Sequence, residues 1–104
     1  MRIRMTRSAI KDVLDAGRFY ETRQVGLERY FKQCIIEDIG SLASFAGIHR
    51  KAAHDFHRVL MKRFPFFVYY RVRGELVIVA AVIDCRRNPE LIDSLLRARQ
   101  RMKR

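Results

Sequence analysis

The sequence predicts an α+β domain, in which an N-terminal strand and a hairpin of two helices pack on a four-stranded antiparallel sheet, with a short C-terminal helix. Residues 9–42 carry apolar side chains at helical spacing, and residues 56–83 form apolar and aromatic runs separated by turn residues. A third observation is Pro89, which suits the first turn of a closing helix. The 104 residues, 49% of them hydrophobic, indicate a single domain over residues 1–104.

The first half of the chain predicts one strand and two helices. Residues 1–5 alternate apolar and basic side chains, which is typical of a half-buried strand. Ser8 is the expected N-cap of a helix that begins at Ala9. Gly26 interrupts the helical pattern, and residues 27–42 then place apolar side chains on one face of a second helix.

The second half predicts three strands and a helix. A loop at residues 49–55 leads into a weakly alternating strand at 56–62, and Pro65 forces a break before the next strand. That strand, residues 66–72, is rich in aromatic and β-branched side chains.

The remaining strand and the helix follow a tight turn. Arg73 and Gly74 form a two-residue hairpin turn, in which the glycine supplies the positive φ. Residues 76–83 have no polar side chain, so they are expected to form a central strand covered on both faces. The last helix is expected to run from Pro89 to Met102.

The positive charge is concentrated in the second half. Through Ile48 the chain holds eight Lys/Arg and six Asp/Glu, a net of +2, and from His49 onward it holds fourteen and five, a net of +9. Such a field attracts nucleic acid or an acidic protein. The alternative is an ordinary solvated surface.

Cysteine usage and hydropathy indicate a cytoplasmic protein without a membrane partner. Cys34 and Cys85 lack C-x-x-C spacing, which favours a reduced, cytosolic chain. Residues 1–7 lack the apolar segment of a signal peptide, and the apolar run at 76–83 is too short to cross a bilayer.

Two segments of the second half resemble a known family. One is R-F-P-F-F-V-Y-Y at 63–70, followed by a glycine turn and a strand ending V-I-D-C at 82–85, and the other is R-R-N-P at 86–89. Weaker matches are G-L at 26–27 with Y-F at 30–31, and I-H-R at 48–50 with H-R-V-L at 57–60. Together they resemble the RelE/ParE superfamily of bacterial type II toxins, nearer the ParE, or plasmid-stabilisation, branch.

The resemblance implies the RelE/ParE toxin fold and a cytosolic toxin that a cognate acidic antitoxin neutralises. It implies DNA gyrase as the target of a ParE-like member, or mRNA on the ribosome as the target of a RelE-like endoribonuclease. A third alternative is an inactive member that serves as a nucleic-acid-binding co-repressor. Operator DNA would be contacted only through the antitoxin, and no cofactor is implied.

The candidate target-binding residues are cationic side chains on and after the predicted strands. Metal-free RNA cleavage needs a base, an acid and cations around one phosphate, and arginine can hold phosphate oxygens in a bidentate way. The alternative is that these side chains form an ordinary solvated strand face, above all in the case of Arg58 and Lys62. The set is Arg58, Lys62, Arg63, Arg86 and Arg87; the candidate catalytic residues of a ribonuclease are His57, Arg58, Lys62, Arg86 and Arg87.

Histidines and tyrosines are further candidates for metal binding, proton transfer or base stacking. His49, His54 and His57 lack a companion cysteine or carboxylate in ligand spacing, so no metal site is expected, and a structural role is favoured for His57. Tyr69 and Tyr70 point to opposite faces of their strand, so one is expected in the core. The other could stack on a base or carry a proton, but cross-strand packing is the commoner role of such a tyrosine.

Two positions depart from the RelE-like pattern. Phe67 stands where the ribonucleases carry an arginine within the strand, and Ile92 stands near the place of their closing tyrosine or histidine. These departures favour a ParE-like protein that binds its target without catalysis. Asp84 is expected to pair with Arg86.

Overall fold

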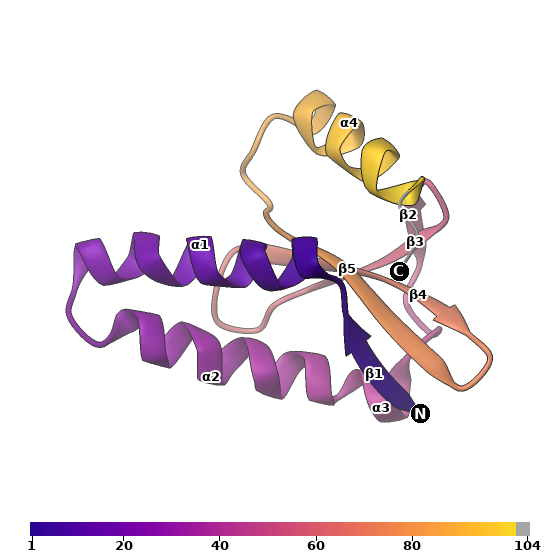
Figure 1. The fold of residues 1–104 in the computed structure, drawn as a ribbon, viewed down its shortest axis with the longest axis horizontal. Coiled ribbons are helices and arrows are strands. Elements are labelled where there is room, and N and C mark those ends of the chain that lie inside the picture. Colours follow the sequence, from indigo (N-terminus) through magenta and orange to yellow (C-terminus); the bar gives the residue numbers. More distant parts are fainter. Residues whose placement is uncertain (102–104) are drawn as a thin grey trace.

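The computed structural model describes residues 1–101 and confirms the α+β class, with one strand more than expected (Figure 1). The predicted end of the last helix at Met102 lies outside the described residues. The elements are β1 (Arg2–Met5), α1 (Arg7–Arg23), α2 (Leu27–Gly40), α3 (Leu42–Phe45), β2 (Lys51–Ala53), β3 (Phe56–Leu60), β4 (Phe66–Arg73), β5 (Leu76–Asp84) and α4 (Pro89–Gln100).

The sheet differs from the prediction in strand number and in one strand direction. It has five strands in the order β1-β5-β4-β3-β2. The strand β1 pairs parallel to β5, with Arg2 opposite Leu76, whereas the other neighbours are antiparallel. The prediction of a four-stranded, fully antiparallel sheet was therefore wrong in these two respects. Local patterning carries no information about direction for two strands so far apart in the chain.

The extra strand, β2, lies at the edge of the sheet within the predicted loop at 49–55. Its residues Lys51–Ala53 contain no β-branched or aromatic side chain, so no strand propensity marked it. A tight turn joins it to β3, and both turn residues, His54 and Asp55, have positive φ values of 52° and 68°. Positive φ at both central positions is typical of a type I′ hairpin turn.

Helix α1 begins earlier than predicted, because its N-cap is Thr6 and not Ser8. The Thr6 hydroxyl accepts a hydrogen bond from the backbone N–H of Ala9 at 3.1 Å. The backbone N–H of Thr6 donates to the carbonyl of Val79 at 3.0 Å. Thr6 thus ends the pairing of β1 with β5 and caps the helix at the same point.

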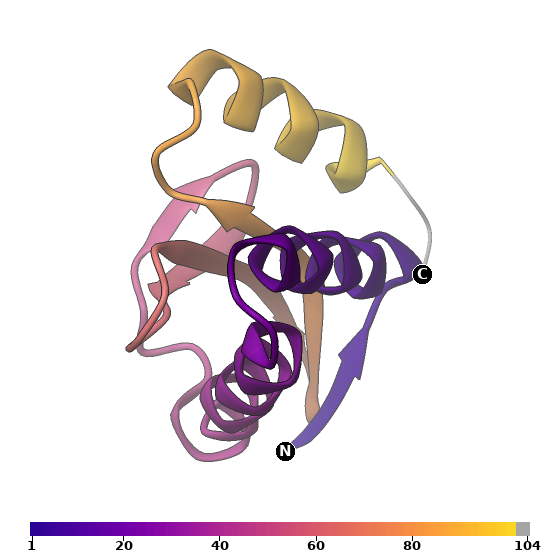
Figure 2. The ribbon, with the colours of Figure 1, turned by 90° about the vertical axis from the view of Figure 1, so that its left-hand side faces the viewer.

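Helices cover both faces of the sheet. In Figures 1 and 2, α1 and α2 run side by side on one face, and α4 lies on the other. The hairpin core includes Phe31, Ile35, Val68 and Tyr70, whereas the core under α4 includes Phe56, Tyr69, Ile83 and Leu96. The prediction of β5 as a buried central strand is confirmed, since seven of its nine residues are buried.

Both tyrosines of β4 are buried, at 2% exposure for Tyr69 and 0% for Tyr70. The alternative in which one of them stacks on a base was therefore wrong, and the packing role is confirmed. Their side chains do enter opposite faces, but each face has its own helical cover. Among residues 1–101, no helix has the length and apolar character needed to cross a membrane.

Candidate target-binding site

Four of the predicted cationic residues gather at one end of the sheet. Residues 61–65 connect β3 to β4, and residues 85–88 follow β5. These two segments meet because Phe66 pairs with Asp84 and the backbone N–H of Cys85 donates to the carbonyl of Pro65 at 2.8 Å. The cationic end is defined here by the exposed residues Lys62, Arg63, Arg86 and Arg87.

Arg86 is held by Asp84, so the predicted pair is confirmed. The guanidinium donates from Nε at 3.0 Å and from Nη2 at 2.7 Å to the two carboxylate oxygens. These hydrogen bonds from Arg86 hold the pKa of Asp84 below its usual range, and the same contact raises the pKa of Arg86. The guanidinium also lies close to the Tyr20 hydroxyl of α1, and burial raises the pKa of that phenol.

The other residues of the cationic end are held less firmly by acidic side chains than Arg86 is. Arg63 lies 3.4 Å from Glu37 of α2. Lys62 donates its backbone N–H to the buried carboxylate of Asp38 at 3.2 Å, which fixes the backbone and leaves the ammonium exposed. Within residues 1–101, the side chains of Lys62 and Arg87 form no ion pair, so these two charges are available to a partner.

Arg58 lies apart from this group. It belongs to β3, and its guanidinium lies 4.2 Å above the ring of Phe67 on the face that α4 covers. The stacking is a cation–π contact, and it places the guanidinium close to the hydroxyl of Tyr69. Arg63 and Arg86 instead reach the helical hairpin, so the predicted five residues do not share one face.

His49 and His57 share Tyr70 as a partner, whereas His54 contacts a different residue. The Nδ1 of His57 donates to the carbonyl of His49 at 2.6 Å, and its ring stacks on Tyr70 with centroids 5.1 Å apart. His49 hydrogen-bonds the Tyr70 hydroxyl, and His54 lies 2.8 Å from Asp93. The part of the chain that the structure describes contains no group of three His, Cys, Asp or Glu side chains arranged to hold a metal ion.

Proton transfer by the β4 tyrosines is disfavoured by their surroundings. Burial raises the pKa of both Tyr69 and Tyr70. The Tyr70 hydroxyl is also occupied, since it accepts from the backbone N–H of Gly47 at 3.1 Å. Phe67 packs against Tyr69 with ring centroids 6.0 Å apart and brings no titratable group to this face.

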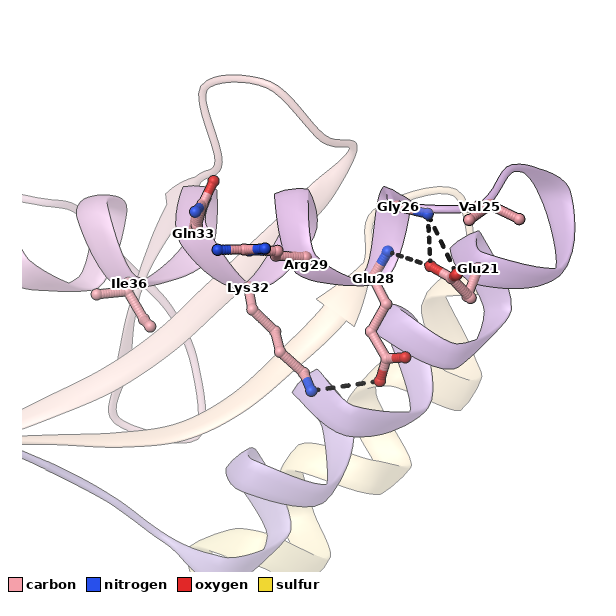
Figure 3. Close-up of a pocket in the computed structure, with 8 residues that line it drawn as sticks. All are labelled: Glu21, Val25, Gly26, Glu28, Arg29, Lys32, Gln33 and Ile36. Atoms are coloured by element: carbon pink, nitrogen blue, oxygen red, sulfur yellow. Dashed lines mark hydrogen bonds and ion pairs between the residues drawn. The ribbon is translucent and has the colours of Figure 1, made fainter.

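A hollow of about 520 Å³ lies on the outer side of the helical hairpin (Figure 3). At its end the Glu21 carboxylate accepts from the backbone N–H groups of Glu28 and Gly26, and these two bonds lower its pKa. Val25 and Ile36 line the hollow and are 88% and 69% exposed. The sequence did not reveal this surface, because an exposed apolar residue on a helix, such as Ile36, cannot be told from a core residue, and Val25 lies in the turn before α2.

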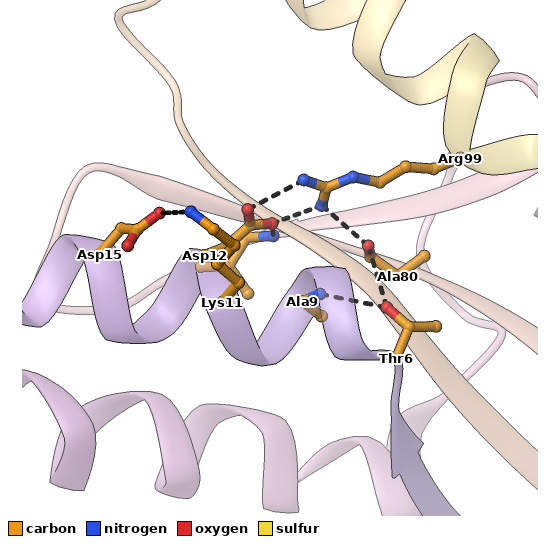
Figure 4. Close-up of polar contacts among 8 residues, drawn as sticks. Thr6, Ala9, Lys11, Asp12, Asp15, Ala80 and Arg99 are labelled. Carbon is orange, nitrogen blue, oxygen red and sulfur yellow. Dashed lines mark hydrogen bonds and ion pairs between the residues drawn. The ribbon is translucent and has the colours of Figure 1, made fainter.

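A group of polar contacts, which no local sequence pattern indicates, joins α4 to α1 (Figure 4). Asp12 forms a bidentate ion pair with Arg99, whose side chain is 14% exposed. The Asp12 carboxylate also accepts from the backbone N–H of Val82 at 2.9 Å, and Arg99 donates to the carbonyl of Ala80 at 3.0 Å. One carboxylate thereby joins the first helix, the central strand and the last helix.

Comparisons with known proteins agree with this architecture. The family model described as the ParE toxin of the type II toxin-antitoxin system parDE matches residues 3–89. A solved structure of a chromosomal ParDE toxin-antitoxin system from P. aeruginosa contains a chain with 24% identity and a TM-score of 0.66. The match covers 81% of this chain and 95% of that chain, and at this identity it shows the fold. No curated protein matches the chain.

Proposed function

Since the chain belongs to the ParE toxin family of type II toxin–antitoxin systems, we propose that it inhibits DNA gyrase by binding and that a cognate acidic antitoxin neutralises it. The observation that supports binding over catalysis is the state of the candidate catalytic groups. Tyr69 and Tyr70 are buried, and His57 is hydrogen-bonded and stacked. Phe67, which stands in the place of a RelE-like arginine, packs beneath Arg58. Among the described residues, the exposed members of the candidate site are cationic side chains that no group suited to proton transfer accompanies.

The cationic end is the proposed contact with the target. Its four charges lie at strand ends, where two loops meet, and among the described residues Lys62 and Arg87 form no ion pair, although the charge of Arg87 also helps to lower the pKa of Asp84. Such charges increase the rate of encounter with an acidic surface and fix the orientation of the bound partner.

The antitoxin is proposed to use the sheet edges and the helical hairpin. The outer strands β1 and β2 each have one unpaired edge that can accept an added strand. The hairpin exposes Phe19, Val25, Tyr30 and Ile36, which an amphipathic helix would cover. Operator recognition is assigned to the antitoxin, and the cytoplasm is the proposed site of action.

The test compares two activities of the full-length purified chain. Gyrase supercoiling of a relaxed plasmid is measured beside primer extension on a translated mRNA. The proposal expects inhibition of supercoiling and no new mRNA ends. The double variant Lys62→Gln/Arg87→Gln should need about tenfold or more protein for the same inhibition, since it removes two unpaired charges.

The matched control is Arg18→Gln/Arg29→Gln, which removes the same charge from exposed positions of the helical hairpin. It should inhibit gyrase as the wild type does. Cleavage of mRNA with unaffected supercoiling would identify the endoribonuclease and overturn the proposal. Inactivity in both assays, with DNA retardation only when antitoxin is added, would favour the co-repressor.

A further inference from the structure

A cleft lined by arginines opens elsewhere on the molecule, on the sheet face that α4 only partly covers. Its volume is about 960 Å³. Among residues 1–101, five arginines line it, and none of the lining residues is acidic. The arginine cleft is defined by Arg4, Arg7, Arg71, Arg73 and Arg99.

Strand register builds the cleft from three neighbouring strands. Arg4 of β1 and Arg71 of β4 both pair with Ile78 of β5, so the two arginines flank one apolar residue on one face of the sheet. Successive side chains of a strand alternate between faces, and Ile78 therefore points away from the hairpin core that holds Val77 and Val79. It forms part of the floor of the cleft.

Two other elements contribute the remaining walls. Arg7 comes from the first turn of α1, and Arg99 comes from the last turn of α4. The ion pair of Arg99 with Asp12 fixes the end of α4 beside the cleft (Figure 4). Helix α4 lies almost entirely beyond residues 3–89, which the ParE toxin family model matches. The cleft therefore depends on a part of the chain outside that match.

The charges of the cleft are only partly compensated within the protein. Arg99 is paired with Asp12, and Arg73 shares Asp55 with Lys51. By contrast, Arg4, Arg7 and Arg71 form no ion pair within residues 1–101. Like charges gathered in this way repel, and a bound anion would relieve the repulsion.

Arg71 shows the strain of this arrangement most clearly. Its guanidinium lies 4.2 Å above the ring of Phe56, and its Nε is buried without a hydrogen-bond partner among the described residues. Burial, followed by the neighbouring charge of Arg73, lowers its pKa, although a guanidinium keeps its charge at neutral pH. The Nη2 of Arg71 donates to the carbonyl of Gln100 at 3.4 Å. An anion bound in the cleft would offset the cost of burying this charge.

The chemistry of the cleft suits a phosphate backbone. Every nucleotide of a nucleic-acid strand carries a charged phosphate, whereas an extended peptide presents side chains to one face only at every second residue. Arginine supplies a planar fork of donors that matches phosphate oxygens, and the described lining of the cleft contributes five such forks and no carboxylate. We propose that the arginine cleft binds consecutive phosphate groups of a nucleic-acid backbone.

This binding would be independent of base sequence. Phosphate contacts position a protein without reading bases. The aromatic ring that the described lining contributes is Phe56, which is fully buried beneath Arg71, so it offers no face for base stacking. The inference does not rest on gyrase as the target, because the residues of the cleft are different from those of the cationic end.

The test uses fluorescence anisotropy with the full-length chain and a labelled 20-base-pair DNA duplex of arbitrary sequence. Arg4→Gln/Arg7→Gln removes two exposed charges that form no ion pair, so the fold should be unaffected. Binding should weaken about tenfold or more. The slope of log K against log salt should become shallower by about 1.8, or 0.9 for each lost contact. Arg18→Gln/Arg29→Gln, which removes the same charge from the hairpin, should bind as the wild type does.

Three outcomes would overturn the proposal. Equal weakening by the two double variants would show binding to diffuse charge and not to the cleft. Tighter binding of a poly-glutamate peptide than of the duplex, lost in Arg4→Gln/Arg7→Gln, would identify an acidic protein as the ligand. Displacement of the duplex by tripolyphosphate at a lower concentration than by unlabelled duplex would identify a small polyphosphate instead.

Discussion

Asp84 and Arg86 determine how much charge the cationic end presents. The carboxylate accepts from the guanidinium and from the backbone N–H of Arg86 at 2.9 Å. Within residues 1–101, Arg87 donates its backbone N–H to the carbonyl of Asp84, and its guanidinium acts on the carboxylate through its charge alone. Two adjacent arginines therefore have different roles. Arg86 orders the segment after β5, and Arg87 is left for a partner.

The same pair predicts a pH dependence. Because the pKa of Asp84 is lowered in the folded state, its contribution to stability is present above the unfolded pKa of about 4 and is lost as the pH falls through the folded pKa. Asp84→Asn should lower the melting temperature at pH 7 and make the decline below pH 4 shallower. Thermal unfolding followed by circular dichroism from pH 2 to 7 checks this. An unchanged acid limb would show that the pair contributes no stability.

At the scale of elements, the last helix and the central strand depend on one partly buried contact, between Asp12 and Arg99. The pairing of β4 with β5 shifts register between Tyr69 and Tyr70, and β1 ends opposite Val79. Beyond that point Asp12 takes the place of a neighbouring strand for the N–H of Val82 and also holds Arg99 of α4. The helical hairpin thus completes the sheet that it covers.

This contact predicts a large effect of one substitution. Asp12→Ala should cost about 3 kcal/mol of unfolding free energy, because it leaves Arg99 and a strand N–H without their acceptor. Urea unfolding measures the loss. Asp15→Ala on the same helix is the matched control, since its ion pair with Lys11 is exposed, and it should unfold near the wild-type midpoint. Equal midpoints for the two variants would contradict the structural role of Asp12.

At the scale of the whole molecule, the net charge of +11 governs encounter with partners. The association rate with an acidic antitoxin should fall about tenfold or more between 50 and 500 mM NaCl, because salt screens charges at long range. The dissociation rate should change much less, since it depends on buried contacts. Stopped-flow mixing separates the two rates. A salt effect confined to dissociation would show that the overall field plays no part in association.

Most elements could be predicted because their signals are local. The apolar stripe of α2, the positive φ of Gly74 and the unbroken apolar run of β5 each follow from neighbouring residues, and the structure contains all three. The turn itself was predicted one residue too early, because Arg73 pairs with Leu76 as the last residue of β4 and the turn residues are Gly74 and Glu75. Among the candidate site residues, the pair of Arg86 with Asp84 could also be predicted, because the two residues are close in sequence. The edge strand β2 was missed because Lys51–Ala53 have no strand propensity and owe their conformation to pairing with β3.

The amino-acid sequence alone determined the α+β class, the family resemblance and the excess of positive charge in the second half, because these depend on composition and short-range pattern. Only the tertiary structure decided that β1 runs parallel to β5, that Asp12 meets Arg99, and that Arg4 and Arg71 flank Ile78. These contacts join residues up to 87 positions apart, and chain folding, which no local pattern encodes, brings them together.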